Sequence, residues 1–335
     1  MNPKICFFGE MLLRLSPNSD HWVTSNNIPC HLGGAELNTA TALANWGIKT
    51  KYVTAVPDNF FSRQALCYFK EKNIDATDIV FSGDRLGLYY LPIGMDVKNA
   101  TIVFDRKNSS FSQLTHSVFS WDNIFKGCSW YHFSTIVQSL NDTIAETSRE
   151  SIQAALQSSV QISVDLNYRA TLWNERNPLK IIPNLVQACD LIMGNIWSIE
   201  KLLGIPSPLE NSEGKTISEL LSAGNSVAEE IFKQYPKAKV IALTFRLDNE
   251  YIGFLKRRDT EYVFSHQKIK TVNDRVGSGD CFMAGLIYGE NQKFSDQKII
   301  DWATAAAINK LKEVGDTTSQ TIADVENTIS EKLQH

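Results

Sequence analysis

The chain has 335 residues, a formal net charge of −4, and 43% hydrophobic and 21% charged residues. These are values of a globular protein rather than of a disordered chain, and the length suits one large α/β domain. The acidic balance offers no basic surface for nucleic acid, and no segment reaches the apolar length of a membrane span. We therefore expect a single domain over residues 1–335 without nucleic-acid or membrane partners.

The N-terminal apolar run is too short for a secretory signal peptide and is followed at once by Glu10. The cysteines are scattered, without a CxxC pair and without neighbouring histidine ligands. They are Cys6, Cys30, Cys67, Cys128, Cys189 and Cys281. This distribution argues against a disulfide framework and against a zinc site. The sequence thus predicts a protein of the reducing cytoplasm.

Short apolar runs alternate with helical patterns along most of the chain. The runs predict strands at residues 5–8, 52–56, 130–133, 161–165, 191–193 and 240–244. The helical patterns lie at residues 35–46, 62–72, 143–157, 196–203, 217–234 and 295–311. This alternation indicates an α/β fold with a mostly parallel sheet covered by helices on both faces. Ligands of such sheets bind beyond the carboxyl ends of the strands.

Two stretches interrupt the alternation and look like β-ribbons, residues 10–32 and 86–104. The second has an apolar segment at 88–93, a turn near 96–99 and a further strand at 101–104. Because an α/β core does not need these strands, they could form a small sheet that stands off the main body as a lid. The alternative is that they extend the central sheet at one edge.

The run Asp274-Arg275-Val276-Gly277-Ser278-Gly279-Asp280 is followed by an apolar helix. A glycine-rich turn that opens a helix presents unpaired backbone N–H groups and the positive end of the helix dipole, and so binds anions such as phosphate. Asp280 would repel a phosphate unless its carboxylate takes a proton from an attacking hydroxyl. Gly277, Ser278 and Gly279 are therefore candidate phosphate ligands, and Asp280 is the candidate base of a phosphotransferase. The alternative is an acid that only stabilises the helix end.

Two helix-associated segments could contact a ligand. Gly33 and Gly34 permit a sharp bend or a close backbone approach, and Asn38, one turn into the next helix, could reach a sugar hydroxyl. A plain loop-to-helix turn would have the same pattern. The alanine-rich last helix, which contains Ala306 and Asn309, could approach a flat ring such as adenine. Its alanines are equally suited to packing a helix against a sheet.

Polar residues also follow two of the predicted strands. Asn167 and Arg169 come directly after the strand at 161–165, and the guanidinium of Arg169 could grip a carboxylate in bidentate fashion. Arg106 follows the second ribbon, where a lid could bring it towards a ligand, although a solvated surface charge would have the same pattern. No HExxH, GxSxG or Walker A pattern occurs, so phosphate binding is assigned to residues 277–279.

Together these features resemble the PfkB, or ribokinase-like, family of carbohydrate kinases along nearly the whole chain. Residues 33–38 are similar to its N-terminal signature and residues 274–280 to its C-terminal one, with Arg275 and Ser278 departing from the usual form. The resemblance implies an α/β, ribokinase-like three-layer α/β/α sandwich with a mostly parallel central sheet and a small β-sheet lid. It also implies an ATP- and Mg²⁺-dependent kinase, whose relatives often form homodimers through the lid strands.

The opening segment and Asp274-Arg275-Val276 are similar to 2-keto-3-deoxygluconate kinases. Arg14 stands where kinases of neutral sugars usually have a sugar-binding aspartate, and loss of that acid suits an anionic substrate. By this resemblance, Arg169 lies nearest the substrate carboxylate. The residues that would contact the ketodeoxy acid are Gly34, Tyr89, Arg106 and Arg169. We expect phosphorylation of the terminal hydroxyl of a sugar acid, most closely 2-keto-3-deoxygluconate. The alternatives are a kinase of a neutral sugar such as fructose or ribose, and a non-catalytic sugar-acid sensor.

Two segments depart from the family pattern and keep the sensor alternative open. Asn195 is followed three residues later by Ser198, where a glutamate that helps to organise Mg²⁺ is common, and Glu200 is the candidate substitute. The nucleotide loop at 244–249 lacks its usual glycines. The expected nucleotide contacts are Thr244, Arg246, Gly277, Gly279, Ala306 and Asn309. Mg²⁺ is expected to be held mainly by the phosphates.

Overall fold

The structure, a computed structural model, describes residues 3–17, 27–92, 102–247 and 249–332. Its largest element is a nine-stranded sheet with the order β15-β14-β13-β12-β11-β10-β1-β4-β6. Neighbouring strands run parallel except at β14, which is antiparallel to both β13 and β15. The strands are β1 (Lys4–Phe8), β4 (Thr50–Val53), β6 (Ile74–Asp75), β10 (Cys128–Ser134), β11 (Gln161–Asp165), β12 (Leu191–Gly194), β13 (Val240–Arg246), β14 (Glu250–Arg257) and β15 (Val263–Lys268). The expected mostly parallel sheet is confirmed.

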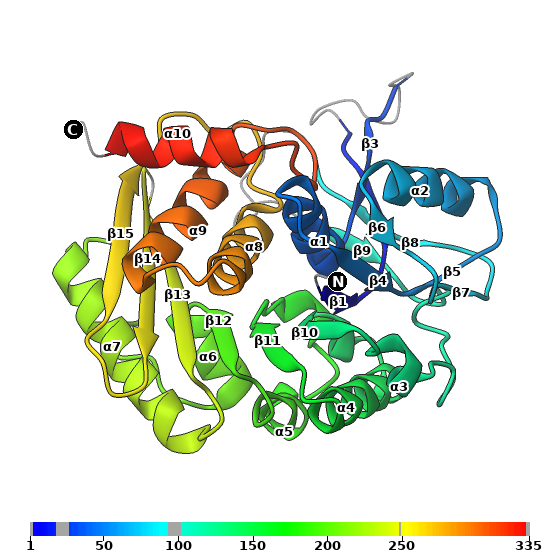
Figure 1. Cartoon of the computed structure of the whole chain (residues 1–335), viewed down its shortest axis with the longest axis horizontal. Coiled ribbons are helices and arrows are strands. Elements are labelled where there is room, and N and C mark those ends of the chain that lie inside the picture. Colours follow the sequence, from blue (N-terminus) through cyan, green and yellow to red (C-terminus); the bar gives the residue numbers. More distant parts are fainter. Residues whose placement is uncertain (1–2, 18–26, 93–101, 248, 333–335) are drawn as a thin grey trace.

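Helices cover both faces of this sheet, which gives three layers (Figure 1). One core takes apolar side chains from α3 (Trp121–Ile124), α4 (Asp142–Gln157), α5 (Ile182–Val186), α6 (Ile196–Leu203) and α7 (Ile217–Gln234). The other takes them from α1 (Ala35–Asn45), α2 (Phe60–Glu71), α8 (Ser278–Asn291), α9 (Asp296–Leu311) and α10 (Ile322–Lys332). The α/β/α sandwich therefore agrees with the expectation.

The central strands contribute to both cores because successive side chains of a strand point to opposite faces. In β1, Ile5 and Phe7 belong to one core and Cys6 and Phe8 to the other, and all four are fully buried. Burial on both faces explains why these strands appear in the sequence as continuous apolar runs rather than as alternating patterns.

The two predicted ribbons form a separate four-stranded sheet with the order β3-β2-β8-β9. Its strands are β2 (Leu12–Leu15), β3 (Cys30–Gly33), β8 (Gly87–Tyr90) and β9 (Val103–Asp105). The inner pair β2–β8 is parallel and the two outer pairs are antiparallel. The alternative that these strands extend the central sheet is therefore wrong. The turn expected near 96–99 lies outside the described residues.

Most predicted elements match the structure to within two residues, and the strand predicted at 52–56 is divided between β4 and the short β5 (Ala55–Val56), which pairs with β7 (Val80–Phe81). The antiparallel strands β14 and β15 and the last helix, α10, were not predicted. Within the ranges that the structure describes, no helix is both long and apolar enough to cross a membrane.

The topology brings several chain segments to one edge of the sheet. The chain passes from β1 to β4 on one side and later returns to β10 on the other side of β1, so the strand order reverses there. A crevice beyond the carboxyl ends of the strands is expected at such a point. The N-terminal ends of α1 and α8 meet at this edge, where Asn38 contacts Asp280.

Candidate active site

A pocket lies beyond the carboxyl ends of β11, β12 and β13, with side chains of the small sheet as one wall. Leu12, Tyr89 and Phe104 belong to that wall. Most predicted site residues line the pocket: Gly34, Asn38, Tyr89, Asn167, Arg169, Thr244, Arg246, Gly277, Ser278, Gly279 and Asp280. Five others lie outside its lining: Gly33, Arg106, Glu200, Ala306 and Asn309. Residues from both sheets and from three separated motifs thus converge on one place.

The turn at 274–280 leads directly into α8, whose first residue is Ser278. Gly277 has a φ of +80°, a left-handed conformation that favours glycine, and a Cβ there would overlap the carbonyl oxygen of Asp316. Apart from the neighbouring residues and the backbone of α8, no atom of the described residues lies within 4 Å of a Cβ placed at Gly279, so open space adjoins the backbone there. The first N–H groups of a helix have no partner within the helix. The turn therefore offers donors to an anion in the pocket.

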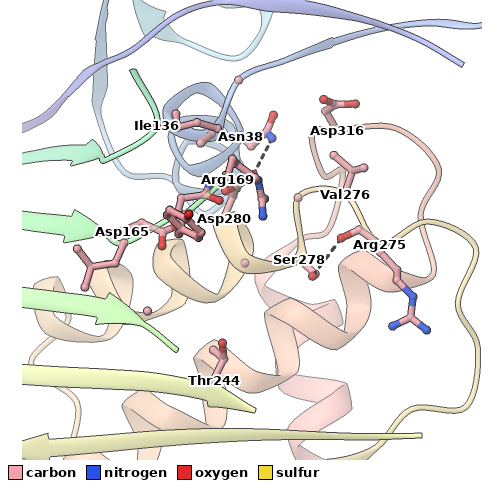
Figure 2. Close-up of a pocket in the computed structure, with 18 of the residues that line it drawn as sticks. Asn38, Ile136, Asp165, Arg169, Thr244, Arg275, Val276, Ser278, Asp280 and Asp316 are labelled. Atoms are coloured by element: carbon pink, nitrogen blue, oxygen red, sulfur yellow. Dashed lines mark hydrogen bonds between the residues drawn. The ribbon is translucent and has the colours of Figure 1, made fainter. Parts of the chain in front are cut away.

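Asp280 is the acid at the centre of the pocket (Figure 2). Its carboxylate accepts a hydrogen bond of 2.7 Å from the amide of Asn38, and only 8% of the residue is exposed. Burial raises the pKa of Asp280 to about 6, while the hydrogen bond from Asn38 opposes this rise. Asp280 is therefore mostly ionised at neutral pH and can accept a proton.

Asp165, at the end of β11, is a second buried acid in the same pocket (Figure 2). Burial and the charge of Asp280 raise the pKa of Asp165 to about 8, so it is mostly protonated at neutral pH. The guanidinium of Arg169 acts on both acids electrostatically, and burial together with the charge of Arg246 lowers the pKa of Arg169. The environment thus separates the roles of the two acids.

Asp316, on the loop after α9, lines the pocket and was missed in the sequence. The Tyr89 hydroxyl donates a hydrogen bond to one carboxylate oxygen of Asp316, and Arg14 Nε lies 2.9 Å from the other. Arg14 also donates to Asp274 at 2.5 Å. Burial raises the pKa of Asp316 to about 6 against the opposing charge of Arg14. This cluster ties the small sheet to the loops around α8.

Arg14 is paired inside the protein and not in the pocket. Its side chain is 2% exposed, lies outside the pocket lining and is neutralised by Asp274 and Asp316. Its charge is used inside the protein and is not offered to a substrate. Asp316 instead brings a carboxylate to the pocket from the far end of the chain, beside Tyr89.

Gly33 and Arg106 lie just behind the pocket wall. A Cβ at Gly33 would overlap the carboxylate of Asp316, so glycine is needed there for the Asp316 side chain to take its place. Arg106 is 3% exposed and donates from Nε to Glu10 at 2.6 Å, which corrects the alternative of a solvated surface charge. Its Nη1 is buried and has no hydrogen-bond partner among the described residues.

The residues expected near the nucleotide base and the metal are placed differently. Ala306 is fully buried, and Asn309 donates to the carbonyl of Asp324 at 3.1 Å. Both lie in packed parts of α9, as the helix-packing alternative expects. Ser198 forms a capping box with Asn195 at the start of α6, whereas Glu200 lies outside the pocket lining beside Lys201.

Within the described residues, no group of three or more histidine, cysteine or acidic side chains could hold a metal ion. Oxygen-bearing side chains at the strand ends in the pocket include Asp165 on β11, Asn195 just after β12 and Thr244 on β13. This donor set suits an ion such as Mg²⁺ that keeps most of its coordination to water and phosphate, and not one in a protein cage.

A family model described as pfkB family carbohydrate kinase matches residues 2–323. The chain is similar to a 2-dehydro-3-deoxygalactonokinase of Haloferax volcanii, with 22% identity over 61% of this chain and 64% of that protein. It is also similar to a 5-dehydro-2-deoxygluconokinase of Clostridium tetani, with 26% identity over 89% of this chain and 84% of that protein.

Two solved structures show the same architecture. A 2-dehydro-3-deoxygluconokinase from Thermotoga maritima has a TM-score of 0.89 and 30% identity, covering 98% of this chain and 99% of that one. A fructokinase from Xylella fastidiosa with bound ATP has a TM-score of 0.72 and 18% identity, covering 99% and 100%, and it supports the fold alone. The converging signatures and these matches along nearly the whole chain lead to one conclusion: the protein belongs to the pfkB family of carbohydrate kinases.

Proposed function

We propose that this protein is an ATP-dependent kinase of a sugar acid, most closely of 2-keto-3-deoxygluconate. The observation that carries the proposal is the buried carboxylate of Asp280 in the first turn of α8. It accepts a hydrogen bond from Asn38 and lines the same pocket as Arg169. The names of the relatives in Thermotoga maritima and Clostridium tetani support a ketodeoxy or deoxyketo sugar acid as the class of substrate.

In the proposed reaction, the terminal hydroxyl of the sugar acid gives its proton to Asp280 as its oxygen attacks the γ-phosphorus of ATP. The bond from that phosphorus to the β–γ bridging oxygen breaks, and ADP leaves. Backbone N–H groups at Gly277, Ser278 and Gly279 would stabilise the negative charge that develops on the phosphoryl oxygens. Asp165, protonated at neutral pH, does not compete for the proton.

An unsatisfied polar atom supports one of the proposed sugar contacts. Asn38 Oδ1 is buried without a hydrogen-bond partner among the described residues. A buried polar atom without a hydrogen bond lowers stability, and a bound ligand can supply the missing partner. Nη1 of Arg106 also lacks a partner among these residues, but Arg106 lies outside the pocket lining, so we assign it no direct sugar contact. A sugar hydroxyl would satisfy Asn38 Oδ1, and Tyr89 and Gly34 line the same pocket. Arg169 would hold the substrate carboxylate, with Asn167 beside it.

The nucleotide would enter along β13, where Thr244 and Arg246 line the pocket. Arg246 replaces a loop glycine of the family pattern and would add a cation near the phosphates. Bound Mg²⁺ would neutralise phosphate charge during transfer, and we assign no direct metal contact to Glu200. Ala306 and Asn309 would act only by shaping the α9 surface on which the base rests.

The experiment that tests this function is a coupled ADP-release assay over a panel of sugar acids and neutral sugars. Arg169→Ala should raise KM for the sugar acid far more than for a neutral sugar, and Arg149→Ala, on the exposed face of α4, should change neither. Equal responses to both sugars would favour a neutral-sugar kinase. Binding of sugar acid without any turnover would favour a sensor.

We also propose a cytoplasmic location and a homodimer formed through the small sheet. All six cysteines are free thiols, which suits a reducing compartment. The edge strand β9 carries Val103, which is half exposed, and could pair with a second copy. Light scattering during size-exclusion chromatography of the protein, and of Val103→Lys, measures whether this edge forms a dimer. A dimer that Val103→Lys does not weaken would contradict this interface.

A further inference from the structure

Lys310 is a buried cation that the reaction proposed above does not use. It lies in the last turn of α9 and is fully shielded from solvent. Its ammonium donates hydrogen bonds to the carbonyl oxygens of Gly315 at 2.7 Å and of Glu313 at 3.3 Å. Burial of an ammonium lowers the stability of a fold unless an opposite charge pairs with it. Because Lys310 is held by neutral carbonyls, ion pairing does not explain its position.

The stem of Lys310 lies against the turn that begins α8. A Cβ at Gly277 would be 3.1 Å from Cε of Lys310. The loop that the ammonium holds is tied to the same turn a second time, because the backbone N–H of Gly315 donates to the Asp274 carboxylate at 3.1 Å. Lys310 thus fixes the 313–316 loop behind the backbone that presents N–H groups to the pocket.

The charge of Lys310 also acts on the reacting groups. Burial raises the pKa of Asp280, and Lys310 is one of the charges that oppose this rise. The other groups that act on Asp280 are Asn38 and Glu36 on α1 and Arg169 after β11. Lys310 also lowers the pKa of Asp316 against the effect of burial. A positive charge behind the turn favours the anionic states that phosphoryl transfer requires.

We propose that Lys310 is a positioning residue of this kinase: a fixed ammonium behind the anion-binding turn that holds the turn and the 313–316 loop together and adds positive charge where the phosphoryl group becomes more negative. The inference rests on the proposed phosphoryl transfer. Because the ammonium is shielded from solvent and, in the part of the chain that the structure describes, hydrogen-bonds to backbone carbonyls, it acts through Gly277 and Asp280 and not on the sugar.

The test compares Lys310→Met, which keeps most of the side-chain length and removes the charge, with Lys298→Met on the exposed part of the same helix. For Lys310→Met we expect kcat to fall by about ten- to a hundred-fold, less than loss of a direct donor to a transition-state anion. KM for the sugar should change little. The acidic limb of the kcat/KM profile should move to higher pH, because Asp280 loses a charge that favours its ionised form. Lys298→Met should leave all three unchanged.

Two further measurements separate this inference from the proposed function. Titration calorimetry with inorganic tripolyphosphate needs no sugar, and Lys310→Met should bind it about three-fold or more weakly than the unaltered protein. If Lys310→Met does not fold, Lys310→Arg decides: it keeps the charge, so its acidic limb should stay in place. Two results would overturn the inference. The first is a Lys310→Met protein whose acidic limb of kcat/KM and affinity for tripolyphosphate are both unchanged. The second is a shift of that acidic limb in Lys310→Arg. Absence of sugar phosphorylation by the unaltered protein would overturn the proposed function alone.

Discussion

Replacement of Asn38 by leucine should move the pH dependence of the reaction. The Asn38 amide donates to Asp280 at 2.7 Å, and both groups are buried. The hydrogen bond favours the ionised carboxylate, so its loss raises the pKa of Asp280 further above its ordinary range. Leucine has the same branching at Cγ as asparagine and is somewhat larger, so Asn38→Leu removes the donor without opening a cavity.

The magnitude follows from the strength of such a bond. A buried hydrogen bond to a charged group contributes about 1.5–3 kcal/mol, and about 1.4 kcal/mol corresponds to one pKa unit. The acidic limb of kcat/KM, expected near pH 6 from the pKa of Asp280, should therefore move upward by roughly one to two units in Asn38→Leu. At a pH well above the limb, only the loss of orientation should reduce kcat.

The assay is a coupled ADP-release measurement of kcat/KM across the pH range, with Asn211→Leu on the exposed 206–215 loop as a matched control. The control should keep the limb of the unaltered protein. An acidic limb that stays in place in Asn38→Leu, with kcat reduced equally at every pH, would refute the link between Asn38 and the ionisation of the base.

Three further changes test the buried charges and the turn. Burial raises the folded-state pKa of Asp165 to about 8, above its ordinary 3.8. Between these two pH values Asp165 ionises in the unfolded chain but not in the folded one, so the free energy of unfolding should fall as the pH rises. Asp165→Asn should flatten this part of the pH profile of unfolding, and an unchanged slope would contradict the prediction. Arg14→Met leaves two carboxylates without their cation and should lower the free energy of unfolding, measured in urea, by about 3–5 kcal/mol. Loss of the exposed Arg63 should lower it by no more than about 0.5 kcal/mol. Equal effects of the two changes would contradict the importance of the buried ion pairs. Gly277→Ala must displace the Asp316 carbonyl and should lower kcat by about ten-fold or more, so near-normal kcat would show that the turn tolerates the shift.

The regular parts of the fold could be predicted because local pattern decides them. The strand at 161–165 and the helices at 196–203 and 217–234 have the predicted bounds. Each has an uninterrupted apolar period, and the two helices begin with capping boxes. The strands β14 and β15 were missed. In β14, both faces are buried, and a glycine interrupts the strand pattern. This glycine, Gly253, allows the close approach of Thr304 on α9, a contact that a local pattern does not reveal.

The site could be predicted only where its residues belong to a local motif. The turn at 277–280 and Asn38 carry such signals, and the structure brings them together. Asp316 lies in an irregular loop, and its partners Arg14 and Tyr89 are far away in the sequence, so no local pattern marks it. The same distance explains why the pairing of Arg14 could not be predicted: a charge in a strand does not show that two carboxylates from the other end of the chain neutralise it.

The most direct test of the account compares sugar-acid binding and turnover in Asp280→Asn. The asparagine keeps the shape of the side chain but cannot accept the proton, so 2-keto-3-deoxygluconate should still bind in a calorimetric titration while kcat falls by about 10²–10⁴-fold. Binding within about three-fold of the unaltered protein together with this loss of kcat is the result we expect. Near-normal turnover in Asp280→Asn would contradict the role of Asp280 as the base and, with it, the proposed mechanism.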